Sequence, residues 1–319
     1  MYAVVGGLRR GRGDPTFRRD LDGTIWRGIR TPQGTATLRL SVVTGSGAEA
    51  TSIEATARGA GAAWVLESVP SMLGALDDVT GFVAHHRQVA EAARRFIGWR
   101  VPRTALVLEA LIPSIIEQKV PGLEAFDSFK TLVHRFGERA PSEGNERGLR
   151  VAPSAAEWAR IPSWEWLRAG VDGARSATAV RAARAAGRLE QCVDLTRDGA
   201  AERLRAIPGV GVWTAAEVRH TALGDPDAVS FGDYHVARDI GWALTGSEVD
   251  DDGLAELLEP YAGHRYRVQG LLKLAGAKRP RHGPRMPSRT PFRTASADRK
   301  PRDRAGVPTA NLVCRTVNS

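Results

Sequence analysis

The sequence predicts an α+β fold in which a small mixed α/β opening is followed by an all-helical core and a basic tail. Apolar and polar residues alternate in the opening, as they do in a half-buried strand. From about residue 104 the apolar residues recur instead at helical spacing. After residue 277, prolines come every few positions among scattered arginines, a composition that is typical of disorder.

The opening is predicted as a domain of residues 1–95 that contains first strands and then helices. The clearest strand signal is the period-two pattern of residues 37–42. In chain order, the expected elements are strands over residues 24–31, 37–42 and 52–58, then helices over residues 61–73 and 82–96.

The all-helical core is predicted over residues 96–277. Its first helix carries an apolar stripe from Leu108 to Ile116 at i, i+3 and i+4 spacing, although Pro113 inside the stripe disfavours an unbroken helix. Residues 140–150, which are rich in Pro, Gly, Asn and charge, are expected to form a loop. The later helices are expected over residues 123–135, 154–159, 164–169, 174–186, 200–206, 212–223, 234–244, 252–258 and 265–275.

The composition excludes several classes of protein. With 42% hydrophobic and 25% charged residues, the 319-residue chain has the composition of a globular protein of two or three domains. Two cysteines rule out a disulfide framework and a four-cysteine cluster. The sequence shows no apolar stretch of membrane-spanning length and no signal-peptide core, so we expect a cytoplasmic protein without a membrane partner.

The net charge of +9 is concentrated in the predicted tail. Residues 278–319 contain 11 Lys and Arg and 2 Asp, whereas residues 1–277 balance 34 basic against 34 acidic side chains. Any affinity of the core for nucleic acid must therefore come from a local patch and from backbone dipoles.

Residues 207–215, Ile-Pro-Gly-Val-Gly-Val-Trp-Thr-Ala, predict a tight hairpin between two helices. Glycine tolerates positive φ and lets another backbone come close. The helix expected from Val212 leaves free N–H groups at its start, which form a site for an anion such as a DNA phosphate. A Pro-Gly-x-Gly run also occurs in ordinary turns, but an aspartate about two dozen residues later, Asp233, favours the helix–hairpin–helix interpretation.

Residues 207–215 together with Gly232-Asp233-Tyr234-His235 resemble the helix–hairpin–helix, Gly/Pro…Asp (HhH-GPD) superfamily of DNA glycosylases, over about residues 14–277. Within this superfamily, a tryptophan at position 213 makes the chain resemble the AlkA-like 3-methyladenine DNA glycosylase II branch. The bifunctional glycosylase/lyases carry a lysine at this position, because their Schiff-base chemistry needs an amine. The resemblance implies a TATA-binding-protein-like opening domain and a helix–hairpin–helix glycosylase core.

The resemblance also implies roles for the candidate site residues. Asp233 is the catalytic carboxylate, which stabilises the positive charge that develops on the sugar as the N-glycosidic bond breaks. The implied substrate-binding residues are Trp213, Glu217, Tyr234 and His235. The implied DNA-binding residues lie in the hairpin and in the loop that probes the duplex, and they are Gln118, Lys119, Pro208, Gly209, Val210, Gly211 and Thr214.

Structural alternatives exist for these residues. Asp233 also looks like the N-cap of the helix expected over residues 234–244, and Trp213 could be a core aromatic. Lys119 stands where AlkA has an apolar wedge, which weakens any wedge here. Glu217 and Gly270 stand where AlkA-like proteins carry aromatic side chains, so a more open and more polar site is expected.

We therefore expect a monofunctional DNA glycosylase that removes 3-methyladenine-type alkylated purines from double-stranded DNA by base flipping, in base-excision repair. The alternative is a non-catalytic protein that binds damaged or bent DNA. The sequence suggests no cofactor and no catalytic metal, although hairpins of this kind often hold a structural monovalent cation. We expect a monomer, and the basic tail would add non-specific DNA affinity.

Overall fold

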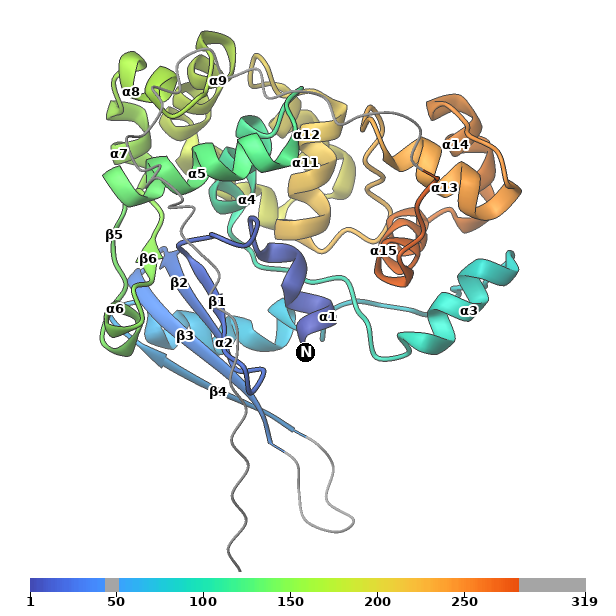
Figure 1. The fold of residues 1–319 in the computed structure, drawn as a ribbon, viewed down its shortest axis with the longest axis horizontal. Helices are drawn as coiled ribbons and strands as arrows, with labels where there is room; N and C mark the ends of the chain where they lie inside the picture. Colours follow the sequence, from blue (N-terminus) through green and yellow to red (C-terminus); the bar gives the residue numbers. More distant parts are fainter. Residues whose placement is uncertain (44–51, 281–319) are drawn as a thin grey trace, which may run out of the picture.

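A computed structural model of the chain describes residues 1–43 and 52–280. Helices surround a four-stranded sheet at one end of the molecule (Figure 1). The predicted disorder of the tail falls almost entirely on residues beyond 280, outside the described part. Within that part, no helix combines the length and the hydropathy that crossing a lipid bilayer requires.

The predicted α+β class and the N-terminal sheet are confirmed. The strands follow one another in chain order, and each pairs with the next in antiparallel fashion. Ala36, Leu38 and Leu40 alternate along the third strand and pack on the first long helix through Val65 and Met72. The elements are α1 (Tyr2–Val5), η1 (Gly6–Leu8), β1 (Phe17–Arg19), β2 (Ile25–Thr31), β3 (Gly34–Val43), β4 (Ser52–Arg58) and α2 (Ala62–Met72).

A second hydrophobic cluster is centred on helix α4, which is buried along almost its whole length. Pro113 is accommodated inside this helix. The carboxylate of Glu190 accepts hydrogen bonds from the N–H groups of Val107 and Leu108, both at 2.9 Å, and so caps its first turn. The elements of this part are α4 (Val107–Ile116), α5 (Gly122–Phe136), α7 (Ala155–Arg160), α8 (Ser163–Arg168), α9 (Gly173–Arg184), α10 (Ala186–Glu190), η2 (Gln191–Asp194), α11 (Arg197–Arg205), α12 (Val212–Val218) and a π-helical turn, η3 (Arg219–Leu223).

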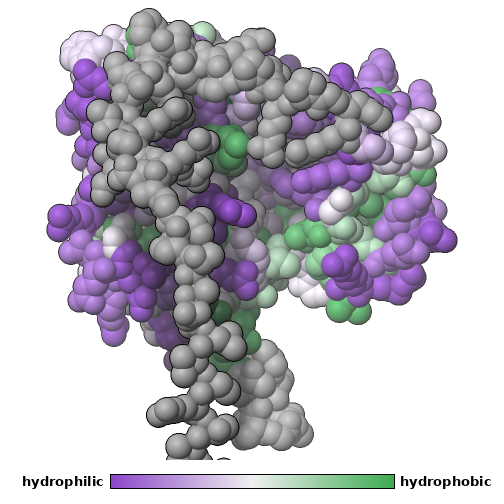
Figure 2. All heavy atoms as spheres, viewed as in Figure 1, coloured by the Kyte–Doolittle hydropathy of each residue, from purple (hydrophilic) through white to green (hydrophobic). Residues whose placement is uncertain are grey.

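A third cluster joins helix α3 of the opening to the last helices of the chain, and Figure 1 shows α3 beside α15. Val89 of α3 packs with Ile240, Leu254 and Val268. In the view of Figure 2 the visible surface is mostly hydrophilic, with a hydrophobic area on this side of the molecule. The elements are α3 (Arg87–Arg95), α13 (Val236–Thr245), α14 (Asp251–Leu258), η4 (Glu259–Tyr261) and α15 (Arg265–Ala275).

A buried ion pair fixes α15 to the rest of the chain. The guanidinium of Arg267 contacts both carboxylate oxygens of Asp77 at 2.7 Å, and both side chains are almost fully buried. Asp77 also accepts the N–H of Val101 at 2.9 Å. Because a buried charge without its partner is costly, this pair fixes how the last helix sits on the segment between α2 and α4.

Three segments differ from the prediction. The predicted loop 140–150 contains α6 (Glu143–Glu146) and β6 (Arg150–Val151). The strand β6 pairs with β5 (Glu138–Arg139). The backbone N–H of Arg150 also donates to the carbonyl of Pro15 in the opening, which holds this segment on the sheet side of the molecule. The helix expected over 82–96 begins only at Arg87, since the hydroxyl of Tyr261 accepts the N–H of His86. The helix expected from Tyr234 begins at Val236.

Candidate active site

The hairpin predicted from the sequence lies between α11 and α12, and Gly209 determines its shape. Gly209 has φ +97°, and a Cβ there would lie 2.1 Å from Oγ1 of Thr178 on α9. A side chain at this position would therefore be strained in the backbone and would clash with α9. Val210 is buried beside it, and its N–H donates to the carbonyl of Ile207 at 2.9 Å.

Two side chains from other helices hold the hairpin. Arg181 donates to the carbonyl of Pro208 through Nε at 3.2 Å and Nη2 at 3.0 Å. The amide Nε2 of Gln118 donates to the carbonyl of Gly209 at 3.0 Å and to Oγ1 of Thr214 at 2.8 Å. Gln118 thus joins the loop after α4 to the hairpin, and Thr214 is buried at this contact.

The start of α12 presents unpaired backbone donors. Within the described ranges, the N–H groups of Gly211, Val212 and Trp213 have no acceptor. A Cβ on Gly211 would meet no atom within 4 Å, and the side chain of Val212 is half exposed. Free N–H groups at the positive end of a helix, with open space in front of them, suit an oxyanion such as phosphate.

The segment of residues 229–235 brings Asp233 to this end of α12. Ser230 donates to Oε1 of Glu217 at 2.6 Å. Two residues later, a Cβ on Gly232 would lie 3.8 Å from Cβ of Trp213. Because Trp213 and Glu217 are four residues apart on one helix face, the segment runs along that face toward the start of α12, and Asp233 follows directly.

Asp233 has a structural role that leaves half of its carboxylate available. The N-cap of α13 is His235 and not Asp233, but Oδ1 of Asp233 accepts the N–H groups of His235 at 2.7 Å and of Val236 at 3.0 Å and so supports the start of the helix from two residues before the N-cap. Within the described part of the chain, Oδ2 accepts no hydrogen bond, and the residue is partly exposed. The two roles of Asp233, support of the helix start and available carboxylate, are therefore compatible in this geometry.

Trp213 and Tyr234 differ in their surroundings. Trp213 is half-buried, and its Nε1 is shielded from solvent without a hydrogen-bond partner. Tyr234 is 61% exposed, and its ring lies 4.4 Å from the guanidinium carbon of Arg238 and 5.6 Å from that of Arg279. Hydrogen bonding to these two arginines lowers the pKa of Tyr234. His235 is also exposed and meets the Tyr234 ring edge-on.

Glu217 lies in a polar network rather than on an open surface. Burial opposes the ionisation of its carboxyl group, but the neighbouring His220 and the hydrogen bond from Ser230 hold its pKa at about 2. Nε2 of His220 lies 3.4 Å from Oε1 of Glu217, an ion-pair distance. The His220 ring stacks on Tyr266 at 3.9 Å, and burial raises the pKa of that tyrosine.

Lys119 is exposed at the end of the loop after α4, where it has φ +55°. This left-handed conformation costs a lysine about 1 kcal/mol or more, so surrounding contacts must hold it. The preceding Gln118 provides such a contact through its bonds to the hairpin. The strained residue thus directly follows the residue that joins this loop to the hairpin.

Gly270 corrects one expectation. It does not open the site, because a Cβ on Gly270 would lie 2.4 Å from Cη2 of Trp99. The glycine is instead required for the packing of α15 against Trp99, in the segment between α3 and α4. Sequence reasoning also missed Arg181, whose position on an exposed helical face gives no signal of its contact with Pro208.

An enclosed cavity between the sheet and α4 lies apart from the predicted site residues. The cavity has a volume of about 30 Å³ and is lined by Arg27, Glu109 and Thr104, among others, and by none of the predicted site residues. No group of three or more His, Cys, Asp or Glu in residues 1–43 and 52–280 is arranged to hold a metal ion.

Comparisons with known proteins agree on the fold. No protein-family model matches the sequence, and no curated protein does. Among solved structures, the chain is similar to a 3-methyladenine DNA glycosylase from Archaeoglobus fulgidus, with a TM-score of 0.64 and 18% identity over 81% of this chain and 89% of that one. It is also similar to MBOgg1 in complex with a low-affinity DNA ligand, with a TM-score of 0.66 and 14% identity over 86% of this chain and 91% of that one. It is similar as well to an 8-oxoguanine glycosylase/lyase from Clostridium acetobutylicum, with a TM-score of 0.62 and 13% identity over 82% of this chain and 89% of that one. The chain therefore shares the fold of these DNA glycosylases.

The two hairpin glycines are expected to respond differently to alanine. Gly209→Ala should lower the free energy of unfolding by about 3 kcal/mol, because it adds a Cβ at positive φ against Thr178. Gly211→Ala should cost less than about 1 kcal/mol, since its Cβ meets open space. Urea unfolding of the two variants measures the difference, and equal losses would show that the hairpin is not packed as described.

Proposed function

We propose that the protein is a monofunctional DNA glycosylase that hydrolyses the N-glycosidic bond of alkylated purines in double-stranded DNA. The observation that carries this proposal is the closeness of Gly232 to Trp213, since a Cβ on Gly232 would lie 3.8 Å from Cβ of Trp213, and Asp233 follows Gly232 directly. The protein acts as a monomer in base-excision repair, in the cytoplasm at the nucleoid.

DNA binding in this proposal relies on local groups. The unpaired N–H groups of Gly211, Val212 and Trp213 bind a backbone phosphate. Arg238 and Arg279, which both lie over the ring of Tyr234, supply positive charge close to the same site. Such local positive groups are needed for DNA binding, because residues 1–277 carry equal numbers of basic and acidic side chains and have no net charge to attract DNA.

Base flipping requires a group that enters the duplex and a surface that receives the base. Lys119 enters the gap while Gln118 holds its loop on the hairpin, and the exposed, strained position of Lys119 supports this role. Trp213 stacks on the flipped base, and its π face attracts a cationic ring. Unstacking costs a few kcal/mol and least for damaged bases, which adds selectivity.

The chemistry needs one carboxylate beside the sugar. The oxygen Oδ2 of Asp233, which accepts no hydrogen bond from the described chain, faces C1′ and stabilises the oxocarbenium-like transition state. It also orients the attacking water. Alkylated purines carry positive charge and leave readily, so no strong acid is required.

The runner-up function is a non-catalytic protein that binds damaged or bent DNA. The observation in its favour is the support that Asp233 gives to the start of α13, because this role is by itself a sufficient reason for an aspartate at position 233. Single-turnover assays on alkylated DNA and binding assays on an abasic analogue separate the two functions. Binding without release of any base favours the runner-up.

A structural monovalent cation at the hairpin remains part of the proposal. The carbonyls of Pro208 and Gly209 already accept hydrogen bonds from Arg181 and Gln118. The carbonyls of Ile207 and Gly211 also accept hydrogen bonds, so among residues 207–211 of the described chain a cation finds an unused carbonyl only at Val210 and shares the others with their donors. No organic cofactor is proposed.

The catalytic role of Asp233 is tested by replacing it with asparagine. Asp233→Asn keeps an oxygen that can support the start of α13 but removes the charge, so release of free 3-methyladenine from methylated DNA should fall at least about 100-fold. Chromatography of the released bases measures the rate, and binding to an abasic-analogue duplex should be unchanged. A matched control is Asp252→Asn, which alters an exposed carboxylate in the first turn of α14 and should leave the rate unchanged. Full activity of Asp233→Asn would contradict the mechanism.

The absence of a lysine at position 213 gives a second prediction. Borohydride should trap no covalent adduct between the protein and alkylated or abasic DNA, because Trp213 has no amine for a Schiff base. Denaturing electrophoresis after reduction detects such an adduct. A trapped species would identify a lyase and place the nucleophile elsewhere in the chain.

The basic tail is tested by truncation. Removing residues 281–319 keeps Arg279, which bonds Glu248 and lies over Tyr234, but removes 9 of the 11 basic residues of the tail. If the tail adds non-specific affinity, the slope of log affinity against log salt should flatten. An unchanged slope would exclude this role.

A further inference from the structure

We propose that Glu217 is a specificity-determining residue that selects a flipped base carrying positive charge, an inference that rests on the proposed function. The class of substrate is a purine alkylated at a ring nitrogen so that the ring is cationic. A neutral lesion of similar shape is discriminated against. Three properties of Glu217 support this role, namely its position, its open oxygen and its charge.

The position of Glu217 follows from the helix and from the segment that crosses it. It lies one helical turn after Trp213, so both side chains project from the same face of α12. The segment of residues 229–235 contacts Glu217 at Ser230 and passes close to Trp213 at Gly232, immediately before Asp233. A base stacked on Trp213 next to Asp233 therefore has Glu217 at its side.

The two carboxylate oxygens have different environments. Oε1 accepts from Ser230, whose hydroxyl in turn accepts from Nε2 of Gln269 at 2.8 Å, while Oε1 of Gln269 accepts the N–H of Ser230 at 3.1 Å. Ser230 and Gln269 are buried, so the carboxylate is held rigidly. Oε2 has no hydrogen-bond partner among the described residues and is not shielded from solvent, since the side chain is 20% exposed.

Other charged groups surround Glu217 without neutralising the open oxygen directly. His220, in the π-helical turn that follows α12, lies 3.4 Å from Oε1. Lys273 of α15 adds attraction at longer range, and Glu117 at the end of α4 adds repulsion but is paired with Arg10 at 3.0 Å. His220 and the hydrogen bond from Ser230 hold the pKa of Glu217 at about 2, which favours its ionised form.

The chemistry of an ionised carboxylate explains the selection. It accepts hydrogen bonds and donates none, so it favours a ring that presents N–H donors and disfavours one that presents carbonyl acceptors. Alkylation of a purine ring nitrogen adds a positive charge that extends over its amino group. In the partly desolvated site this charge interacts with Glu217 much more strongly than it would in water.

The test compares binding of a cationic base with binding of its neutral counterpart. The experiment uses the Asp233→Asn variant so that the base is not cleaved during the measurement. The two duplexes carry either 7-methylguanine or 7-methyl-7-deazaguanine, which differ in the charge of one ring. The ratio of the two dissociation constants reports the preference for charge. We expect Asp233→Asn to favour the cationic duplex at least about tenfold, and Glu217→Gln in the same background to reduce the preference about tenfold.

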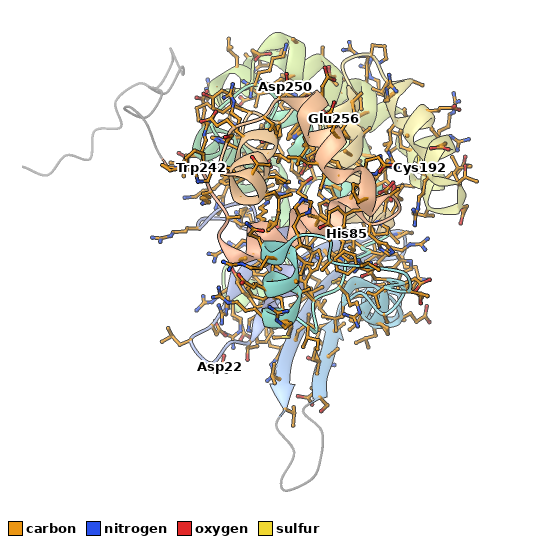
Figure 3. All side chains as sticks on the ribbon, turned by 90° about the vertical axis from the view of Figure 1, so that its right-hand side faces the viewer. Asp22, His85, Cys192, Trp242, Asp250 and Glu256 are labelled. Carbon is orange, nitrogen blue, oxygen red and sulfur yellow. The ribbon has the colours of Figure 1, made fainter. Side chains whose placement is uncertain are left out.

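Controls separate a role in selection from a role in folding. Glutamine keeps an oxygen that accepts from Ser230, and Glu217→Asp keeps the charge, so the aspartate variant should retain part of the preference. Glu256→Gln removes a similar charge from the exposed face of α14, seen in Figure 3 near Asp250, and should leave the ratio unchanged. Thermal unfolding of each variant confirms that it is folded.

The outcomes distinguish this inference from the proposed function. If the unmodified protein releases 7-methylguanine but Glu217→Gln leaves the ratio of dissociation constants unchanged, Glu217 does not select charge. If Asp233→Asn itself shows no preference for the cationic duplex, the inference also fails. If the unmodified protein releases no base from methylated DNA, the proposed function fails.

Discussion

The candidate site depends on the contacts that Ser230 makes between two helices. Its hydroxyl donates to Glu217 of α12 and accepts from Gln269 of α15, and its side chain is almost fully buried. These bonds fix the start of a short segment that ends at the first turn of α13. The positions of Gly232 and Asp233 beside Trp213 follow from this anchor. The anchor is itself fixed, because the Arg267–Asp77 pair holds α15 in place.

The sequence predicts the local features of this arrangement well. Helical periodicity indicates α4, and a turn that needs glycine indicates the hairpin, because both patterns depend on residues close together in the chain. The contacts of Gln118 with Gly209 and of Arg181 with Pro208 join residues 91 and 27 positions apart. Such pairs are set by tertiary packing, and single side chains on helix surfaces do not reveal them. Gly270 illustrates the same limit, since its partner Trp99 lies in another part of the chain.

Asp233 shows how one residue can meet a structural and a chemical demand together. A carboxylate has two oxygens, and the start of α13 uses only Oδ1. The bonds from His235 and Val236 also fix the direction of the other oxygen. This support of the helix start therefore holds the carboxylate in place before any substrate binds, which reduces the ordering that catalysis would otherwise require.

The charges of the site present an apparent conflict, because Asp233 and Glu217 are anionic in a region proposed to bind a polyanion. The conflict is resolved by distance along α12. In the proposed function, phosphate binds at the first turn, where unpaired N–H groups carry the positive end of the helix. Glu217 lies one turn further on and is proposed to face the extruded base instead of the phosphate. In this proposal the N–H groups at the first turn of α12 favour the anionic backbone of DNA, and the carboxylates of Glu217 and Asp233 favour a cationic base. The same helix therefore contributes to both parts of the proposed recognition.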